Sequence, residues 1–291
     1  MLKPRLEELW YWVRERESIR RKRLAGERPP WTKDPILSAY RFCNVRREDD
    51  KVTRWIADEI RGPYSTHPHL WLMLCIARQI NLPATLGELI STERAWPSHS
   101  KFSPAKLGKV MDARRDRGDQ VYTGAYMIRA ESDKSAPWFN ETKQWYLARI
   151  VIGKLWQDRR KFDPFPTTLQ ETHERLLKYR GWGPFMAYQA VVDMRFTNLL
   201  NRAPDRGTWA CMGPGTKRGL NRLSGRAVDA PLSQEEGLKE ILELYHHPER
   251  PKDIPMDLSD VPNICCEYDK WVRVKSGEGR PRSTYTPRGS A

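Results

Sequence analysis

The feature that most constrains the fold is the segment Gly181-Trp182-Gly183, which lies between two stretches with helical periodicity. Residues on either side recur at the three- and four-residue intervals of one helical face: Leu169, His173, Leu176 and Leu177, then Phe185, Tyr188, Gln189 and Val192. Glycine permits a positive φ and a close backbone approach, and Pro184 suits the first turn of a helix. The sequence therefore predicts a helix–hairpin–helix unit whose second helix turns its first amides toward an anion.

Helical periodicity recurs along the rest of the chain and predicts an all-α protein. The expected helices cover residues 2–25, 68–80, 86–93, 104–115, 138–159, 236–246 and 257–274. Residues 121–130 are expected to form a small extended hairpin or lid. We predict a single helical domain over residues 1–275, with a basic N-terminal helix within residues 1–30. A flexible basic tail is expected over residues 276–291.

The charge balance favours a polyanionic partner. Lysine and arginine number 51 against 37 acidic residues, a formal net charge of +14. The 12 tryptophans and 11 tyrosines add surfaces on which bases can stack, although most aromatic residues fill the core of a protein. The alternative is a basic surface that only confers solubility.

The five cysteines show no paired spacing that would hold zinc or an iron–sulfur cluster, so no metal site is expected. An odd number of scattered cysteines is typical of reduced thiols. The sequence shows no signal peptide and no apolar run of membrane-spanning length. We therefore expect a cytoplasmic protein that does not enter a membrane.

Several common catalytic motifs are missing. The segment Gly213–Gly219 does not match the GxxxxGK[ST] phosphate loop, and no GxGxxG, HExxH or nucleophile elbow is found. What remains is Asp205, which lies between the first glycine segment and a second one followed by Lys217 and Arg218. Asp205 is either a reactive carboxylate or a cap for a helix near Thr208.

A second dense group of polar and aromatic residues surrounds Tyr40. On a helix, Tyr40, Asn44 and Arg47 would share one face and suit a pocket for a charged, planar ligand. The alternative is a helix end, at which Asn44 stops one helix, Asp49 or Asp50 caps the next and Arg46 pairs with a nearby carboxylate.

Four segments together carry a resemblance: Arg41-Phe-Cys-Asn44 with Arg46 and Asp50, Gly181–Phe185, Gly213–Leu220, and Cys266–Lys270. In this order, across residues 36–272, they resemble the bacteriophage amino acid:DNA transferases, also called α-glutamyl/putrescinyl-thymine pyrophosphorylases. The related helical domain of hydroxymethyluracil DNA kinases shares the resemblance. The hairpin followed by an aspartate is also similar to the core of helix-hairpin-helix DNA glycosylases.

The resemblance implies a glycosylase-like helical fold that acts on bacteriophage DNA in the cytoplasm of the infected bacterium. In that family, a 5-hydroxymethyluracil already activated as its pyrophosphate ester is flipped out of duplex DNA. The amine of an amino acid, such as glycine or serine, or of a polyamine then displaces pyrophosphate from the methylene carbon. Phe185 stands where a lyase would carry a lysine, which disfavours Schiff-base chemistry.

The resemblance also implies site roles. Asp205 would be the catalytic base. DNA would be bound by Gly181, Trp182 and Gly183, and the pyrophosphate by Gly213, Gly215, Thr216, Lys217 and Arg218. The substrate-binding residues would be Tyr40, Arg41, Asn44, Arg46, Gln189, Trp209, Glu267 and Lys270. Glu267 and Lys270 would either pair with each other or hold the two charged ends of the amino acid.

No cofactor is expected, and the need for a divalent cation beside the pyrophosphate stays open. The protein is expected to act as a monomer on double-stranded DNA. Two alternatives also stay open: a monofunctional DNA glycosylase that removes a modified pyrimidine, with Asp205 stabilising the sugar cation, and a DNA-binding module without catalysis.

Overall fold

The computed structural model describes residues 5–124, 130–279, 281 and 284–285. These residues form helices joined by loops, together with one isolated β-bridge between Tyr40 and Thr284. The all-α prediction is thus confirmed. The chain divides into two compact units, one formed by Met1–Asp50 with Thr208–Ala291 and the other by Lys51–Gly207. The predicted single domain over residues 1–275 includes both units and stays a prediction.

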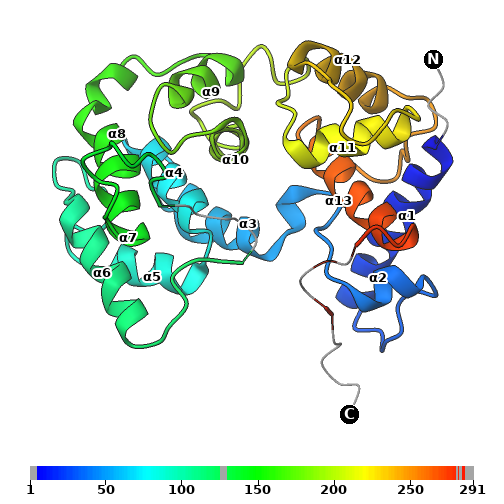
Figure 1. Cartoon of the computed structure of the whole chain (residues 1–291), viewed down its shortest axis with the longest axis horizontal. Coiled ribbons are helices and arrows are strands. Elements are labelled where there is room, and N and C mark those ends of the chain that lie inside the picture. Colours follow the sequence, from blue (N-terminus) through cyan, green and yellow to red (C-terminus); the bar gives the residue numbers. More distant parts are fainter. Residues whose placement is uncertain (1–4, 125–129, 280, 282–283, 286–291) are drawn as a thin grey trace. The chain divides into compact units, whose positions relative to one another are not determined.

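The first unit is built around its last helix. Its elements are α1 (Leu6–Leu24), α2 (Pro35–Ala39), the short helix η1 (Arg47–Asp49), α11 (Pro214–Leu223), α12 (Gln234–Tyr245) and α13 (Asp260–Lys275). α13 packs against α1, α2, α11 and α12 (Figure 1). The contact with α11 is especially close, because a Cβ on Gly219 would lie 2.1 Å from the Cys265 carbonyl oxygen. A larger residue at position 219 would push the two helices apart.

Local capping residues set where helices of this unit begin. Ser233 and Glu236 form the predicted capping box of α12: each side chain accepts a hydrogen bond from the other residue's backbone amide. At α2, Asp34 Oδ1 accepts hydrogen bonds from the amides of Ile36 and Leu37, both at 2.8 Å. These starts are therefore encoded within a few residues of sequence.

The second unit comprises α3 (Lys51–Ile56), η2 (Ala57–Arg61), α4 (Leu70–Ile80), α5 (Pro83–Ser91), α6 (Pro104–Asp116), α7 (Lys143–Trp145), η3 (Tyr146–Ile152), α8 (Gly153–Gln157), η4 (Arg159–Phe162), α9 (Leu169–Leu177) and α10 (Pro184–Met194). Its core is α4, in which every residue is buried, as its apolar sequence predicts. α4 packs against α10. At this contact Arg78 forms a two-point ion pair with Asp193, and both side chains are buried.

Two sequence predictions about local structure are wrong. The helix expected over residues 138–159 begins only at Lys143, where Thr142 caps it, and it continues as a wide π-helical turn over η3. Residues 138–142 form turns instead, since Pro137 precedes them and Thr142 supplies the helix cap. Residues 41–46 are not helical either, because α2 already ends at Ala39.

Half of the predicted hairpin or lid at residues 121–130, namely residues 125–129, lies outside the described residues. In the part that is described, Tyr122 is half-buried and its hydroxyl lies 3.7 Å from Met111 Sδ. None of the helices in the described ranges is both long enough and apolar enough to cross a bilayer.

Candidate functional site

The hairpin between α9 and α10 is a candidate binding element and belongs to the second unit. α9 and α10 flank it as the periodicity predicts, and they pack against each other. Gly181 has a φ of +82°, and a Cβ there would lie 2.5 Å from Val151 Cγ2. Gly183 has an ordinary φ of −82°, and an added Cβ would meet nothing within 4 Å. Gly181 is thus needed for the turn itself, whereas Gly183 leaves open space in front of the start of α10.

Trp182 holds this hairpin in place. Its side chain is 3% exposed, its Nε1 donates to the Val151 carbonyl at 3.2 Å, and its amide donates to the Tyr179 carbonyl. Both donors are therefore used inside the protein. Trp182 therefore positions the hairpin, and the DNA contacts predicted for Gly181, Trp182 and Gly183 stay a prediction.

Arg180, just before the hairpin glycines, is tied to a loop earlier in the chain. Its Nε donates to Glu131 Oε2, and its Nη2 lies 3.5 Å from Asp133 Oδ2. The Glu131 carboxylate also accepts hydrogen bonds from the amides of Ser132 and Asp133 and from Trp138 Nε1. These bonds hold the pKa of Glu131 well below its ordinary value, with the Arg180 bond as the largest cause. The ion pair is therefore present throughout the physiological pH range.

Asp205, the predicted catalytic carboxylate, caps a helix. Its Oδ1 accepts a hydrogen bond from the Leu169 amide and its Oδ2 from the Gln170 amide, both at 2.9 Å. Thr168 Oγ1 completes the cap by accepting from the Glu171 amide. Asp205 thus caps α9 and not the Thr208 segment named as the alternative. Each carboxylate oxygen keeps a second lone pair, so the side chain retains capacity for one more partner on each oxygen.

The segment Arg41–Asn44 belongs to the first unit and is held by α1. Arg16 on α1 donates from Nε to the Cys43 carbonyl at 3.0 Å and from Nη2 to Asn44 Oδ1 at 2.6 Å. The backbone amide of Asn44 in turn donates to Asp50 Oδ1 at 2.8 Å. Burial raises the pKa of Asp50 above its ordinary value. Asn44 therefore stabilises the loop from within and offers little of its side chain to a ligand.

The same segment is joined to α13. Glu267 Oε2 accepts a hydrogen bond from the Cys43 amide at 2.9 Å and from Lys270 Nζ at 2.7 Å. Lys270 Nζ also lies 4.6 Å from the centre of the Phe42 ring, a cation–π contact. The structure thus brings two of the resemblance segments together. Glu267 and Lys270 pair with each other, which is the first of the two roles left open for them.

The turn at Gly213 starts α11 and packs on α13. Thr216 Oγ1 donates to the Pro262 carbonyl at 2.9 Å, so its hydroxyl is used between the two helices. Arg218 Nε lies 3.1 Å from Asp269 Oδ2, and Arg222 Nε lies 2.6 Å from the other oxygen of the same carboxylate. Arg218 is thus held at a fixed position while part of its guanidinium stays exposed. Lys217 is half-buried.

The remaining predicted substrate residues are divided between the units. In the first unit, Tyr40 and Trp209 are half-buried, Arg41 is exposed, and Arg46 Nη1 lies 3.8 Å from Asp49 Oδ2, the pairing proposed as its alternative role. In the second unit, Gln189 is buried within α10. Three of the four resemblance segments therefore meet at α13, and the fourth is the hairpin.

Four of the five cysteine thiols are poorly suited to act as nucleophiles. Burial raises the pKa of Cys43 and of Cys75 well above the ordinary value, and that of Cys211 and of Cys266 to about 12. A thiol with such a pKa carries almost no thiolate at neutral pH. In the described ranges, no group of three or more His, Cys, Asp or Glu side chains is arranged to hold a metal ion.

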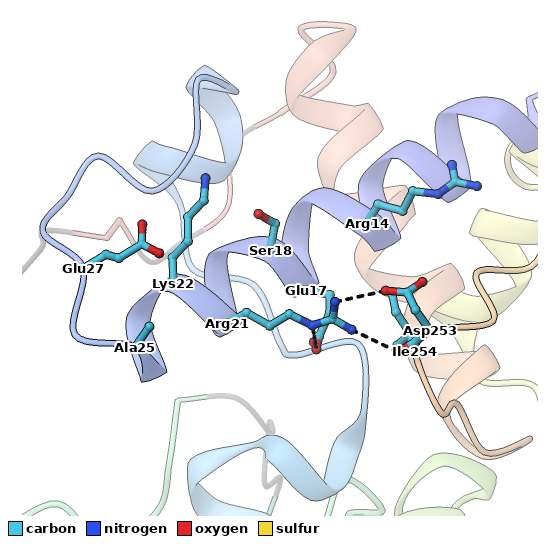
Figure 2. Close-up of a pocket in the computed structure, with 9 residues that line it drawn as sticks. All are labelled: Arg14, Glu17, Ser18, Arg21, Lys22, Ala25, Glu27, Asp253 and Ile254. Atoms are coloured by element: carbon cyan, nitrogen blue, oxygen red, sulfur yellow. Dashed lines mark hydrogen bonds and ion pairs between the residues drawn. The ribbon is translucent and has the colours of Figure 1, made fainter.

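A hollow of about 390 Å³ lies beside α1, away from all of these segments in the sequence. Figure 2 shows Arg21 reaching from α1 to Asp253, with Nη1 3.0 Å from Oδ2 and Nη2 3.0 Å from the backbone carbonyl. Arg21 also bonds Glu17, and Lys22 Nζ donates to the Trp31 carbonyl. Arg21 and Lys22 are thus already bonded within the protein, whereas the exposed Arg14, which also lines the hollow, has no ion pair within the described residues.

Sequence reasoning missed the residues that connect distant segments. Arg16 was one arginine among many on a charged helix, and Glu131 lay in a stretch without a motif. Their partners are 27 and 49 residues away, respectively. No local pattern reports such a pairing. A buried arginine on a basic helix is recognisable only when its neighbours are known.

Comparison with known proteins assigns the chain to a family. The chain is a member of the family described as "5-hmdU DNA kinase, helical domain", which it matches over residues 3–280. A curated relative, the 5-hmdU DNA kinase of Bacillus phage SP10, is 26% identical over 289 residues. The alignment covers 91% of this chain and 44% of the relative, so the chain spans less than half the length of that protein. No solved structure shows a significant match.

Proposed function

We propose that this protein modifies thymine-derived bases in bacteriophage DNA. It would bind duplex DNA that carries a 5-hydroxymethyluracil activated as its pyrophosphate ester, and join the methylene carbon to the amine of an amino acid or polyamine. The observation that carries the proposal is the family match over residues 3–280, since the family is named for a 5-hydroxymethyl-deoxyuridine substrate in DNA. The net charge of +14 supports a polyanionic partner.

In the proposed reaction, the amine nitrogen attacks the methylene carbon and the carbon–oxygen bond to pyrophosphate breaks. The electron pair of that bond leaves with the pyrophosphate, and the ammonium proton passes to a base. Asp205 is the proposed base, through the lone pairs that its two bonds to α9 leave unused. Within the first unit, the partly exposed Arg218 side chain, with Lys217 and the first amides of α11, is suited to bind an anion such as pyrophosphate.

The proposed base-flipping step needs a rigid element that binds the DNA backbone. The hairpin is suited to it, because Gly181 closes against Val151 and Trp182 is anchored on the same residue. Open space in front of Gly183 would let a phosphate reach the first amides of α10. Similarity of this region to the DNA glycosylases, including the flipped base, is part of the proposal.

The test is a transfer assay. DNA carrying pyrophosphorylated 5-hydroxymethyluracil is incubated with isotopically labelled glycine, serine, glutamate or putrescine, and the digested nucleosides are analysed by mass spectrometry. Label retained in a nucleoside supports transfer. Release of a free base would instead support the glycosylase alternative and overturn the transfer step.

Asp205→Asn tests the base. We expect a fall in turnover of at least about 100-fold, the lower end of general-base effects. The matched control is Asp58→Asn, an exposed aspartate in the same unit, which should leave turnover unchanged. Full turnover in Asp205→Asn would remove Asp205 from the mechanism.

The hydrogen bonds that both Asp205 carboxylate oxygens accept from the start of α9 favour a second function. If both oxygens serve only to cap that helix, the chain is a helical module that recognises 5-hydroxymethyluracil in DNA and leaves chemistry to another protein or domain. This function predicts tighter binding to DNA that contains the modified base than to thymine DNA, with no change in the nucleosides. Binding that falls with salt and survives Asp205→Ala would support it.

A further inference from the structure

We propose that Phe185 is a base-contacting residue, whose ring stacks on a nucleobase that has left the DNA helix at the α9–α10 hairpin. The inference deepens the proposed function and rests on it, because it requires DNA at this hairpin. It concerns recognition of the unstacked base and not the transfer step.

The first observation is exposed apolar surface beside the hairpin. Phe185 is 40% exposed at the second position of α10, and Leu177 is 38% exposed at the last position of α9. Among the described residues, the exposed large hydrophobic side chains are these two, Tyr11 and Leu24. Half of them therefore lie at the two helix ends that the hairpin joins. Of the two, Phe185 presents an aromatic ring, the kind of side chain on which an unstacked base can stack.

The second observation is that the charge beside this surface suits DNA. Arg175 is paired with Glu171, and Arg180 with Glu131. Lys178, between them, is exposed, and no ion pair holds it within the described part of the chain. A cation that is not neutralised by the protein remains available to a phosphate. The hairpin therefore combines one available cation with an aromatic ring three residues beyond Trp182.

The third observation is rigidity. Val151 contacts both the Gly181 turn and the Trp182 indole, and His173 Nε2 lies 3.0 Å from the Pro184 carbonyl oxygen, joining α9 to the start of α10. The backbone that carries the Phe185 ring is therefore held in place, and it loses little further conformational freedom when a ligand stacks on the ring. Because every base has a π face, stacking of this kind tolerates any base and contributes independently of salt.

The experiment compares two DNA duplexes that differ only in one base. Binding of the full chain is measured by fluorescence anisotropy with a fully paired duplex and with the same duplex carrying one bulged thymidine. We expect Phe185→Ala to weaken binding to the bulged duplex roughly 5- to 150-fold, the range of one base–aromatic contact. Binding to the paired duplex should change much less. Phe185→Trp should retain the affinity of the wild type.

Two further variants separate stacking from other causes. Phe185→Leu keeps apolar area without a π face, so stacking predicts weak binding, and wild-type affinity in this variant would overturn the inference. Lys178→Ala should reduce the slope of log K against log salt by about one, on both duplexes. Leu24→Ala, an exposed apolar residue at the end of α1, is the control and should bind like the wild type.

The outcomes distinguish this inference from the proposed function. Salt-dependent DNA binding by the wild type, with Phe185→Ala equal to it on both duplexes, would overturn only the role of Phe185. Absence of DNA binding by the wild type would overturn both. Since Phe185 is partly exposed, Phe185→Ala is expected to fold, and an unchanged circular dichroism spectrum verifies this.

Discussion

Removing the buried carboxylate of Asp193 should strongly destabilise the second unit. Arg78 is 2% exposed and Asp193 is fully buried, so neither group can turn to water when its partner is lost. Replacing Asp193 by alanine would leave the Arg78 guanidinium charged and without its main acceptor. Loss of one partner of a buried ion pair typically costs about 3–5 kcal/mol of unfolding free energy.

The remaining contacts of Arg78 limit how well the site can adapt. Its Nη2 donates to Thr53 Oγ1 at 3.0 Å and its Nη1 to Asn81 Oδ1 at 3.2 Å, but neither partner is charged. Neutral acceptors such as these do not replace a carboxylate. For a unit of about 150 residues, 3–5 kcal/mol corresponds to a fall of roughly 6–20 °C in the unfolding temperature.

The assay is thermal unfolding of the full chain, with hydrogen exchange of peptides from α4 and α10 to locate the change. The matched control is Asp119→Ala, which removes a carboxylate from an exposed ion pair with Arg117 in the same unit; it should cost less than about 1 kcal/mol. The double variant Arg78→Met with Asp193→Leu should recover most of the loss, since no buried charge remains. A cost below about 1 kcal/mol for Asp193→Ala would refute this reasoning.

Three smaller predictions concern single side chains. Gly181→Ala should weaken both stability and DNA binding, because a β-carbon there is strained and crowded, whereas Gly183→Ala should leave stability within about 0.5 kcal/mol; equal urea midpoints would contradict this. Gly219→Ala should destabilise the first unit by about 2 kcal/mol or more, seen as faster hydrogen exchange in α11 and α13; unchanged exchange would show that the helices separate easily. Burial and neighbouring histidines lower the pKa of His67 from 6.5 to about 4, so the unfolded chain binds the extra proton first and stability is lost as pH falls between these values. His67→Gln should flatten that part of the pH dependence of the urea midpoint, and an identical slope would exclude His67 as its source.

Local sequence patterns predicted much of the fold. α12 begins at its capping box, α4 is buried throughout, and α9 and α10 flank the hairpin as expected. Each of these depends on residues only a few positions apart, where capping and helical periodicity act. The helix expected over residues 138–159 is present from Lys143 to Gln157, and only its start was predicted too early, because a local cap and turn exclude residues 138–142 from the helix.

The candidate site was predicted less fully, because its residues take their roles from distant partners. The sequence placed Asp205 between two glycine segments, but its hydrogen bonds go to the start of α9. Glu267 and Lys270 were left with two roles, and the structure shows the pair together with the bond to Cys43. A motif can identify which residues matter while leaving undecided which of their atoms remain available.

The α9–α10 hairpin shows most clearly which features are local and which depend on tertiary packing. That two helices meet around Gly181 and Gly183 can be read from the local sequence, since glycine conformation and helical periodicity are local properties. The inward side chain of Trp182, the bond from Arg180 to Glu131 and the exposure of Phe185 follow from packing between distant segments. The reason is that burial and pairing depend on segments far along the chain, and packing alone brings those segments together.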